Sequence, residues 1–191
     1  MCRFIESIQV VNAIPKHLFW HQMRINKTFD KFFPEKQKPD LELLITQFQL
    51  TDGGQQKLRI VYDDSNLDWE ILAYYPKKIE TIEWVECNFE YAHKFENRTD
   101  ITNVLNSTQA DEVIFTKNGK ILDSSYSNLA FLYDNQWFTP NTYLLNGTTR
   151  QRLLSTGQIK ETEISLEDLT QFSKISFINA LNDLGTNVIN I

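Results

Sequence analysis

The sequence predicts an α+β fold with two subdomains, and three observations lead to this expectation. First, 191 residues are enough to bury a substantial apolar core in one or two small domains. Second, β-rich runs and helically spaced apolar residues mix along the chain without the regular βαβα order of a parallel α/β fold. Third, Pro76-Lys77-Lys78 forms a polar break. We therefore expect a small α/β subdomain over residues 1–78 and a larger subdomain over residues 79–191, which meet near residues 76–90.

The first subdomain is expected to contain two strand regions and two helices. Residues 4–11 (FIESIQVV) predict a strand, and Pro15 can start a helix. The apolar face of that helix would be formed by Leu18, Phe19, Met23, Ile25 and Phe29. The elements predicted after it are a loop over 30–39, a helix over 40–48, a turn at Asp52-Gly53-Gly54, and a strand pair over 57–62 and 69–75.

The second subdomain is expected to consist mainly of short strands. The strands predicted there lie at 79–87, 112–116, 121–122, 129–133, 137–139 and 174–178, with a turn at Asn118-Gly119. Helical spacing predicts helices over 97–108, 148–155 and 166–172. Ser165 and Asp168 resemble a capping box at the start of the last helix, with Asp in place of Glu.

Charge and composition exclude several classes of protein. With 19 basic and 25 acidic residues the net charge is −6, which argues against nucleic acid or anionic membrane as the main partner. No apolar run approaches the roughly 20 residues of a membrane helix, and the N-terminal sequence lacks a secretory leader, so a cytoplasmic location is expected. Two cysteines and three histidines make neither a disulfide framework nor a dedicated metal site.

Lys94 is the first candidate for a reactive side chain. It lies among aromatic residues in the segment FEYAHKF (89–95), and apolar surroundings lower the pKa of an amine toward reactivity. The alternative is an ordinary solvated side chain, because Lys94 is one of thirteen lysines.

A second candidate is a helix start that could hold a phosphate. Gly147 precedes Thr148-Thr149-Arg150 and a helical pattern, so free backbone N–H groups and hydroxyls would meet there. A plain N-cap is the alternative. Taken alone, Arg24 can be a surface charge and Asp123 an ordinary turn residue.

Eight segments together form a recognisable series. In chain order they are Ile5-Glu6-Ser7-Ile8-Gln9-Val10, His21-x-x-Arg24, Lys94-Phe95-Glu96-Asn97-Arg98, Asp111-Glu112-Val113-Ile114, Ser127-Asn128-Leu129-Ala130-Phe131, Thr139-Pro140, Leu145-Asn146-Gly147-Thr148-Thr149-Arg150 and Phe177-Ile178-Asn179-Ala180-Leu181. Their order and spacing resemble the class IV aminotransferases. These are pyridoxal-phosphate enzymes that include branched-chain and D-amino-acid aminotransferases and 4-amino-4-deoxychorismate lyase. The resemblance implies the two-subdomain fold of that family and pyridoxal 5'-phosphate as the cofactor.

The resemblance also implies roles for individual residues. Lys94 matches the catalytic lysine that bonds covalently to the cofactor and then moves the proton. Arg24 matches the arginine that contacts the cofactor phosphate, and Thr148 and Thr149 match the loop that holds the same phosphate. A dianionic phosphate needs a helix N-terminus and a cation, which agrees with these assignments.

Asp123 falls at the position of the family's glutamate, which pairs with the pyridine nitrogen and keeps the ring electron-withdrawing. Asp is one methylene shorter, so the backbone must come closer or a water must bridge the gap. Asn128 belongs to the adjoining stretch and is expected to help bind the cofactor. Thr148 also departs from the family, where many members carry an apolar residue. The family's upstream strand and glycine-rich segment are expected to be missing from the small subdomain.

Among these enzymes, Arg98 directly after Asn97 favours the lyase, because aminotransferases more often carry an aromatic residue there. The expected reaction eliminates pyruvate from 4-amino-4-deoxychorismate and gives 4-aminobenzoate, a folate precursor. One alternative is an aminotransferase that acts on a D- or branched-chain amino acid, and a second is a non-catalytic protein on the same scaffold. The resemblance further implies a homodimer.

Overall fold

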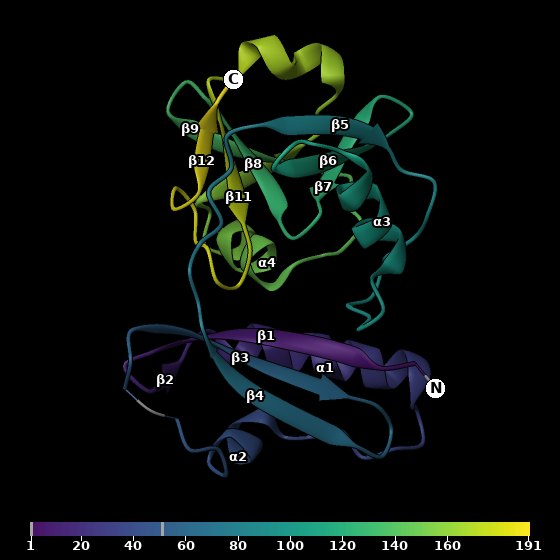
Figure 1. Ribbon diagram of the computed structural model, residues 1–191, viewed down its shortest axis with the longest axis vertical. Coiled ribbons are helices and arrows are strands. Elements are labelled where there is room, and N and C mark those ends of the chain that lie inside the picture. The colour runs from purple at the N-terminus through teal and green to yellow at the C-terminus, as the bar shows by residue number, and fades with distance from the viewer. Residues whose placement is uncertain (1, 51) are drawn as a thin grey trace. The chain divides into compact units, whose positions relative to one another are not determined.

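The computed structural model describes residues 2–50 and 52–191 and divides the chain into two compact units. The first unit runs to Tyr75 and includes His93–Asn97, and the second contains Pro76–Ala92 and Arg98–Ile191. The helices and strands of the two units are labelled in Figure 1. No helix among the described residues has the length and apolar character needed to cross a membrane.

The first unit is an antiparallel sheet with two helices. The strands are β1 (Phe4–Val11), β2 (Ile14–Pro15), β3 (Gln55–Tyr62) and β4 (Leu67–Ala73), in the order β2-β1-β3-β4. The helices are α1 (Leu18–Phe32) and α2 (Leu41–Ile45). Every second residue of β1 is fully buried, which is the alternation expected of a strand with one covered face. Both helices pack their apolar side chains against β1 and β3, and the fully buried members of this core include Phe4, Ile8, Leu41, Leu58 and Ile60.

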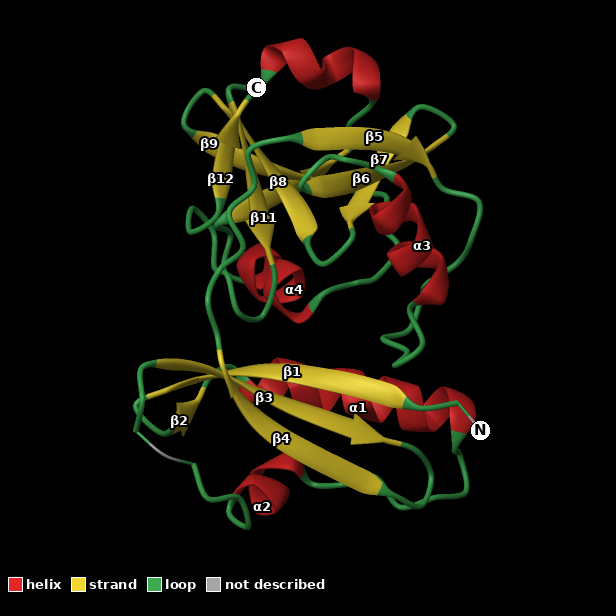
Figure 2. Ribbon diagram, in the orientation of Figure 1, coloured by secondary structure: helices red, strands yellow, loops and turns green. Residues whose placement is uncertain are grey.

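The second unit contains two sheets and two α-helices (Figure 2). A three-stranded sheet has the order β5 (Ile82–Glu86), β6 (Glu112–Lys117) and β7 (Lys120–Ser124). A five-stranded sheet has the order β10 (Ile159–Thr162), β9 (Gln136–Pro140), β8 (Asn128–Tyr133), β11 (Lys174–Ile178) and β12 (Val188–Asn190). The helices are α3 (Thr99–Ser107), α4 (Thr148–Ser155) and the 3₁₀ helix η1 (Leu166–Gln171). Strands of both sheets meet in one core that includes Ile114, Ile121, Leu129, Phe131 and Phe177.

The observed division differs from the expected one at Lys94, which was expected in the larger subdomain. Its carbonyl accepts a 2.9 Å hydrogen bond from the N–H of Ile5, and Phe95 forms a bridge with Phe4. These contacts place residues 93–97 in the first unit, against β1. Non-local pairing of this kind leaves no local signal in the sequence.

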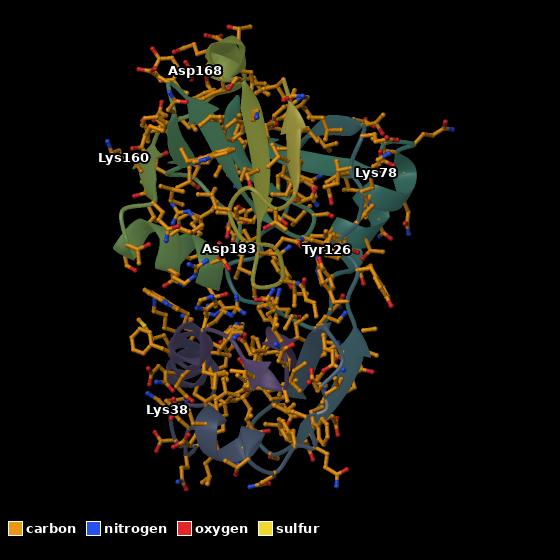
Figure 3. The ribbon with its side chains drawn as sticks, turned by 90° about the vertical axis from the view of Figure 1, so that its left-hand side faces the viewer. Lys38, Lys78, Tyr126, Lys160, Asp168 and Asp183 are labelled. Carbon is orange, nitrogen blue, oxygen red and sulfur yellow. The ribbon has the colours of Figure 1, made fainter. Side chains whose placement is uncertain are left out.

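Helix boundaries follow local chemistry only in part, since Pro15, expected to start a helix, lies in β2 and α1 begins at Leu18. Ser165 and Asp168 form the expected capping box, with Asp168 accepting from the Ser165 N–H at 2.8 Å (Figure 3). The helix that follows is 3₁₀ rather than α-helical. The first helix extends to Phe32, into the stretch that was expected to be a loop, because its prolines begin only at Pro34.

Candidate active site

Lys94 lies in the first unit, where aromatic rings surround its segment. Its side chain is half-buried, and its neighbours Phe95 and His93 contact rings of the core. The Phe95 ring lies 5.0 Å from that of Phe4, and the His93 ring lies 4.7 Å from that of Phe32. The aromatic surroundings inferred from sequence are therefore present around the lysine's segment.

Arg24 is held by a buried carboxylate in the same unit. Its Nε donates to Glu6 Oε1 at 2.8 Å, and its Nη2 forms a second hydrogen bond to Glu6 Oε2. His21, one turn earlier on α1, contacts Glu6 Oε2 through Nδ1 at 2.6 Å. The Arg24 side chain is only 10% exposed, so it is not the surface charge that remained open from the sequence.

Burial and neighbouring charge set the protonation states of this cluster. Burial by itself would raise the pKa of Glu6, but the charge and hydrogen bonds of Arg24, and then those of His21, lower it to about 2. Burial lowers the pKa of His21, against the pull of Glu6, and the charges of Arg24 and Lys94 lower it further. At neutral pH Glu6 is therefore ionised and His21 is neutral.

Glu6 and His21 belong to motifs that the sequence analysis quoted, but neither was given a role there, and both contact the candidate residue Arg24 or its partner. A signal was present, because Glu6 interrupts the apolar strand 4–11 in phase with its buried residues. A carboxylate on the covered face of a strand requires a cationic partner, and α1 supplies one.

Asp123 lies at the end of β7, buried in the second unit. Its Oδ1 accepts a 2.7 Å hydrogen bond from Asn128 Nδ2, and its Oδ2 accepts from the N–H groups of Leu144 and Leu145 at 3.0 and 2.8 Å. Burial raises the pKa of Asp123 to about 7, although these hydrogen bonds and the charge of Arg150 oppose the shift. Asp123 is thus more than an ordinary turn residue, because it anchors the loop that leads to α4.

Asn128 links Asp123 to the start of α4. The same Nδ2 group also donates to the carbonyl of Leu145 at 2.8 Å. A Cβ atom on Gly147 would lie 2.1 Å from Asn128 Oδ1, so only glycine allows the carboxamide to pack against this turn. The backbone angle of Gly147 is ordinary, with φ −67°, and space rather than conformation requires the glycine.

The N-terminus of α4 offers the donors of an anion site. No side chain caps it, and Thr148 and Thr149 are 4% and 5% exposed. The first N–H groups of a helix have no partner inside the helix and carry its positive dipole end. Together these groups fit a phosphate.

Arg150, in the first turn of α4, connects this helix to the neighbouring strands. It is 3% exposed, donates to the Pro140 carbonyl at 3.0 Å, and pairs with Glu161. Its guanidinium carbon also lies 4.5 Å from the centre of the Tyr143 ring. These contacts fix the first turn of α4 to β9 and β10.

The predicted site residues thus fall into two groups. The first unit brings Lys94 and Arg24 near His21. In the second unit Asn128 hydrogen-bonds to Asp123 and to the Leu145 carbonyl, and Gly147 packs against its carboxamide. Arg98 belongs to the second unit, where it donates to the Ser125 carbonyl and lies 4.4 Å over the ring of Tyr126 (Figure 3).

Comparisons with known proteins agree with this fold and these motifs. The family model for amino-transferase class IV matches residues 4–186. An uncharacterised protein of Haemophilus influenzae is 32% identical over 189 residues, which cover 96% of this chain and 100% of that protein. A proposed 4-amino-4-deoxychorismate lyase from Haemophilus somnus 129PT is 34% identical with a TM-score of 0.89, and the match covers 96% of this chain and 98% of that chain.

More distant structures share the fold. A hypothetical aminotransferase from Mycobacterium tuberculosis, solved in a PLP-bound form, is 16% identical with a TM-score of 0.76, over 99% of this chain and 80% of that chain. The chain therefore belongs to the class IV aminotransferase family, with the α/β fold of that family. It is a pyridoxal-phosphate-dependent enzyme, as the motifs implied.

Proposed function

We propose that the chain is a lyase that converts 4-amino-4-deoxychorismate to pyruvate and 4-aminobenzoate, a folate precursor. The observation that carries the proposal is the 34% identity, over 96% of the chain, to the Haemophilus somnus protein described as a proposed lyase of this kind. The Lys94-x-x-Asn97-Arg98 segment supports it, since its resemblance is to the lyases.

The second unit fits pyridoxal phosphate at two points. The start of α4, where Gly147 precedes the buried residues Thr148 and Thr149, suits the phosphate. Asp123 suits the protonated pyridine nitrogen, because that charge would favour ionisation of a carboxyl group whose pKa burial raises to about 7. Asn128 would fix the distance between Asp123 and the turn that binds the phosphate. In the first unit, Arg24 would supply the cation for the phosphate.

Lys94 would carry the proton chemistry. Bound pyridoxal phosphate supplies an electron sink, which acidifies the carbon that bears the substrate amine. The uncharged Lys94 amine would bond to the cofactor before turnover and accept the proton from that carbon afterwards. Lys94 would then return this proton to the enolpyruvyl group, which would leave as pyruvate on cleavage of the adjacent carbon–oxygen bond, and the ring would become aromatic.

Product analysis tests this assignment. Purified protein with pyridoxal phosphate is incubated with 4-amino-4-deoxychorismate, and 4-aminobenzoate and pyruvate are measured in equal amounts if the proposal holds. A parallel incubation with D- or branched-chain amino acids and 2-oxoglutarate tests the aminotransferase alternative. Glutamate without 4-aminobenzoate would reject the lyase, and no product in either assay would favour the non-catalytic alternative.

The residues assigned to the cofactor do not separate the lyase from the aminotransferase alternative, because both reactions would use them. Arg98, which favours the lyase in sequence, is engaged with Ser125 and Tyr126. Its contribution to the lyase would therefore pass through the 123–127 loop.

We also propose that the chain forms a homodimer, as the resemblance implies. The edge strand β4 carries an exposed apolar side chain on each of its faces, Trp69 at 42% and Leu72 at 38% exposure. Burial of such groups against a second copy would stabilise a dimer. Sedimentation of the protein as a monomer at micromolar concentration would contradict this proposal.

A further inference from the structure

Glu6 is a carboxylate placed in the middle of an apolar strand face. It lies on β1 between Phe4 and Ile8, and all three residues are 0% exposed. An unpaired carboxylate in such a place costs several kcal/mol, whereas Gln or a hydrophobic residue would not carry that cost. The charge at this position therefore needs a reason beyond packing.

The geometry around Glu6 supplies such a reason. Arg24 binds it in a bidentate manner, with Nε on Oε1 at 2.8 Å and Nη2 on Oε2, and this arrangement fixes the plane of the guanidinium. His21 binds Oε2 at 2.6 Å. His21 and Arg24 are three residues apart on α1, so both reach the strand from one face of the helix.

Further contacts hold the helix segment that carries the two side chains. The hydroxyl of Thr28 donates to the Arg24 carbonyl at 3.0 Å. Tyr62 on β3 lies close to Glu6. Burial is the largest cause of the raised pKa of the Tyr62 phenol, and the negative charge of Glu6 is the second. The cluster is therefore enclosed by both β1 and β3 as well as α1.

We propose that Glu6 and His21 are positioning residues that set the orientation of the Arg24 guanidinium for the cofactor phosphate. The inference rests on the proposed role of Arg24 and goes beyond it. Glu6 fixes the guanidinium plane through two hydrogen bonds, and neutral His21 donates to the carboxylate and fixes the plane of Glu6 in turn.

The test compares two probes that differ only in the phosphate, pyridoxal phosphate and pyridoxal. Both carry the aldehyde, so the ratio of their dissociation constants reports the phosphate contacts alone. The ratio is measured by absorbance titration for the wild type, Glu6→Gln, Arg24→Gln and the double variant. Glu70→Gln is the matched control, because Glu70 pairs with Arg59 at the exposed surface of the same unit.

If the inference holds, Glu6→Gln weakens pyridoxal phosphate binding about tenfold, the size expected for one misplaced charge-assisted hydrogen bond, and leaves pyridoxal binding unchanged. The double variant then matches Arg24→Gln, because Glu6 acts through Arg24. Equal weakening of both probes, or additive effects in the double variant, would overturn the inference. The control variant should behave as the wild type.

The outcomes separate this inference from the proposed function. A wild type that binds neither probe would reject the cofactor assignment itself. An unchanged ratio in Arg24→Gln would reject the phosphate role of Arg24, and the inference with it, while leaving the enzyme class intact. If Glu6→Gln does not fold, the ratio is measured for Glu6→Asp, which keeps the negative charge but has a side chain one methylene shorter. An unchanged ratio in that variant would also overturn the inference.

Discussion

The carboxamide of Asn128 donates a 2.7 Å hydrogen bond to the buried carboxylate of Asp123. Its Nδ2 group also binds the Leu145 carbonyl, two residues before Gly147. One side chain thus connects the acid proposed for the pyridine nitrogen to the turn proposed for the phosphate. Two ends of a rigid cofactor require anchors at a fixed separation, and this connection provides it within a single unit.

Replacement of Asn128 by alanine should loosen both anchors. The variant removes the Asn128 donor from Asp123 Oδ1 and from the Leu145 carbonyl, while the N–H groups of Leu144 and Leu145 still bind Asp123 Oδ2. We therefore expect a loss of about 1–3 kcal/mol in the free energy of unfolding. Urea denaturation measures it. Asn103→Ala, at an exposed position of α3, is the control and should change stability by less than about 0.5 kcal/mol. Equal stabilities of Asn128→Ala and the control would contradict the linking role.

Gly147→Ala should be destabilising for a steric reason. The new Cβ would lie 2.1 Å from Asn128 Oδ1, and one of the two must move. We expect a loss of about 1–3 kcal/mol, the usual cost of overpacking, together with weaker binding of pyridoxal phosphate. Combining it with Asn128→Ser removes the clash, so the double variant should lose less than the sum of the two single effects. Full additivity would show that the contact does not matter.

The stability of the apo protein should fall between about pH 4 and pH 7 through Asp123. Its pKa is raised to about 7 in the folded state from an ordinary value of 3.8, so the folded protein binds the extra proton in this range. The contribution of Asp123 to the free energy of unfolding is therefore complete below pH 3.8, its pKa in the unfolded chain, and is lost as the pH rises toward 7. The loss is at most about 1.4 kcal/mol per pH unit. Urea midpoints at pH 4.5 and 7 measure it. Asp123→Asn should flatten this dependence, and an unchanged slope would contradict the assignment.

Glu6 should act with the opposite sign at lower pH. Its folded pKa of about 2 lies below the ordinary value of 4.5, so its contribution is present above pH 4.5 and is lost as the pH falls toward 2. A pKa shift of this size corresponds to a contribution of roughly 3 kcal/mol to the free energy of unfolding. Acid titration followed by circular dichroism should show a shallower acid transition for Glu6→Gln. An identical transition would mean that Glu6 is not held ionised by Arg24.

Much of the fold could be predicted because local signals were strong. The strand at 4–11, the helix at 148–155 and the strand at 174–178 have the expected bounds. The two strands have a clear hydrophobic pattern, and the helix follows Gly147, which marks its start. The short strands β10 and β12 were not predicted, because Ile159–Thr162 is half charged and Val188–Asn190 spans only three residues. Their strand form depends on pairing with β9 and β11.

The site could be predicted only in part, because it too depends on contacts between segments that are distant in the sequence. The motif positions gave Lys94, Arg24 and the 147–149 turn, but the partners of these groups depend on contacts between distant segments. Glu6, the carboxylate that binds Arg24, lies 18 positions from it in the sequence. Asp123, the carboxylate that binds the N–H of Leu145, lies 22 positions from that residue. Such pairs leave no periodic pattern.

The most direct test of the central claim is the bond between Lys94 and the cofactor. The purified protein is mixed with pyridoxal phosphate, its visible absorbance is recorded, and borohydride is added before the modified peptide is mapped. We expect a visible band that borohydride removes, with the label on Lys94 and neither band nor label in Lys94→Ala. A label on a different lysine, or a wild type without the band, would contradict the account.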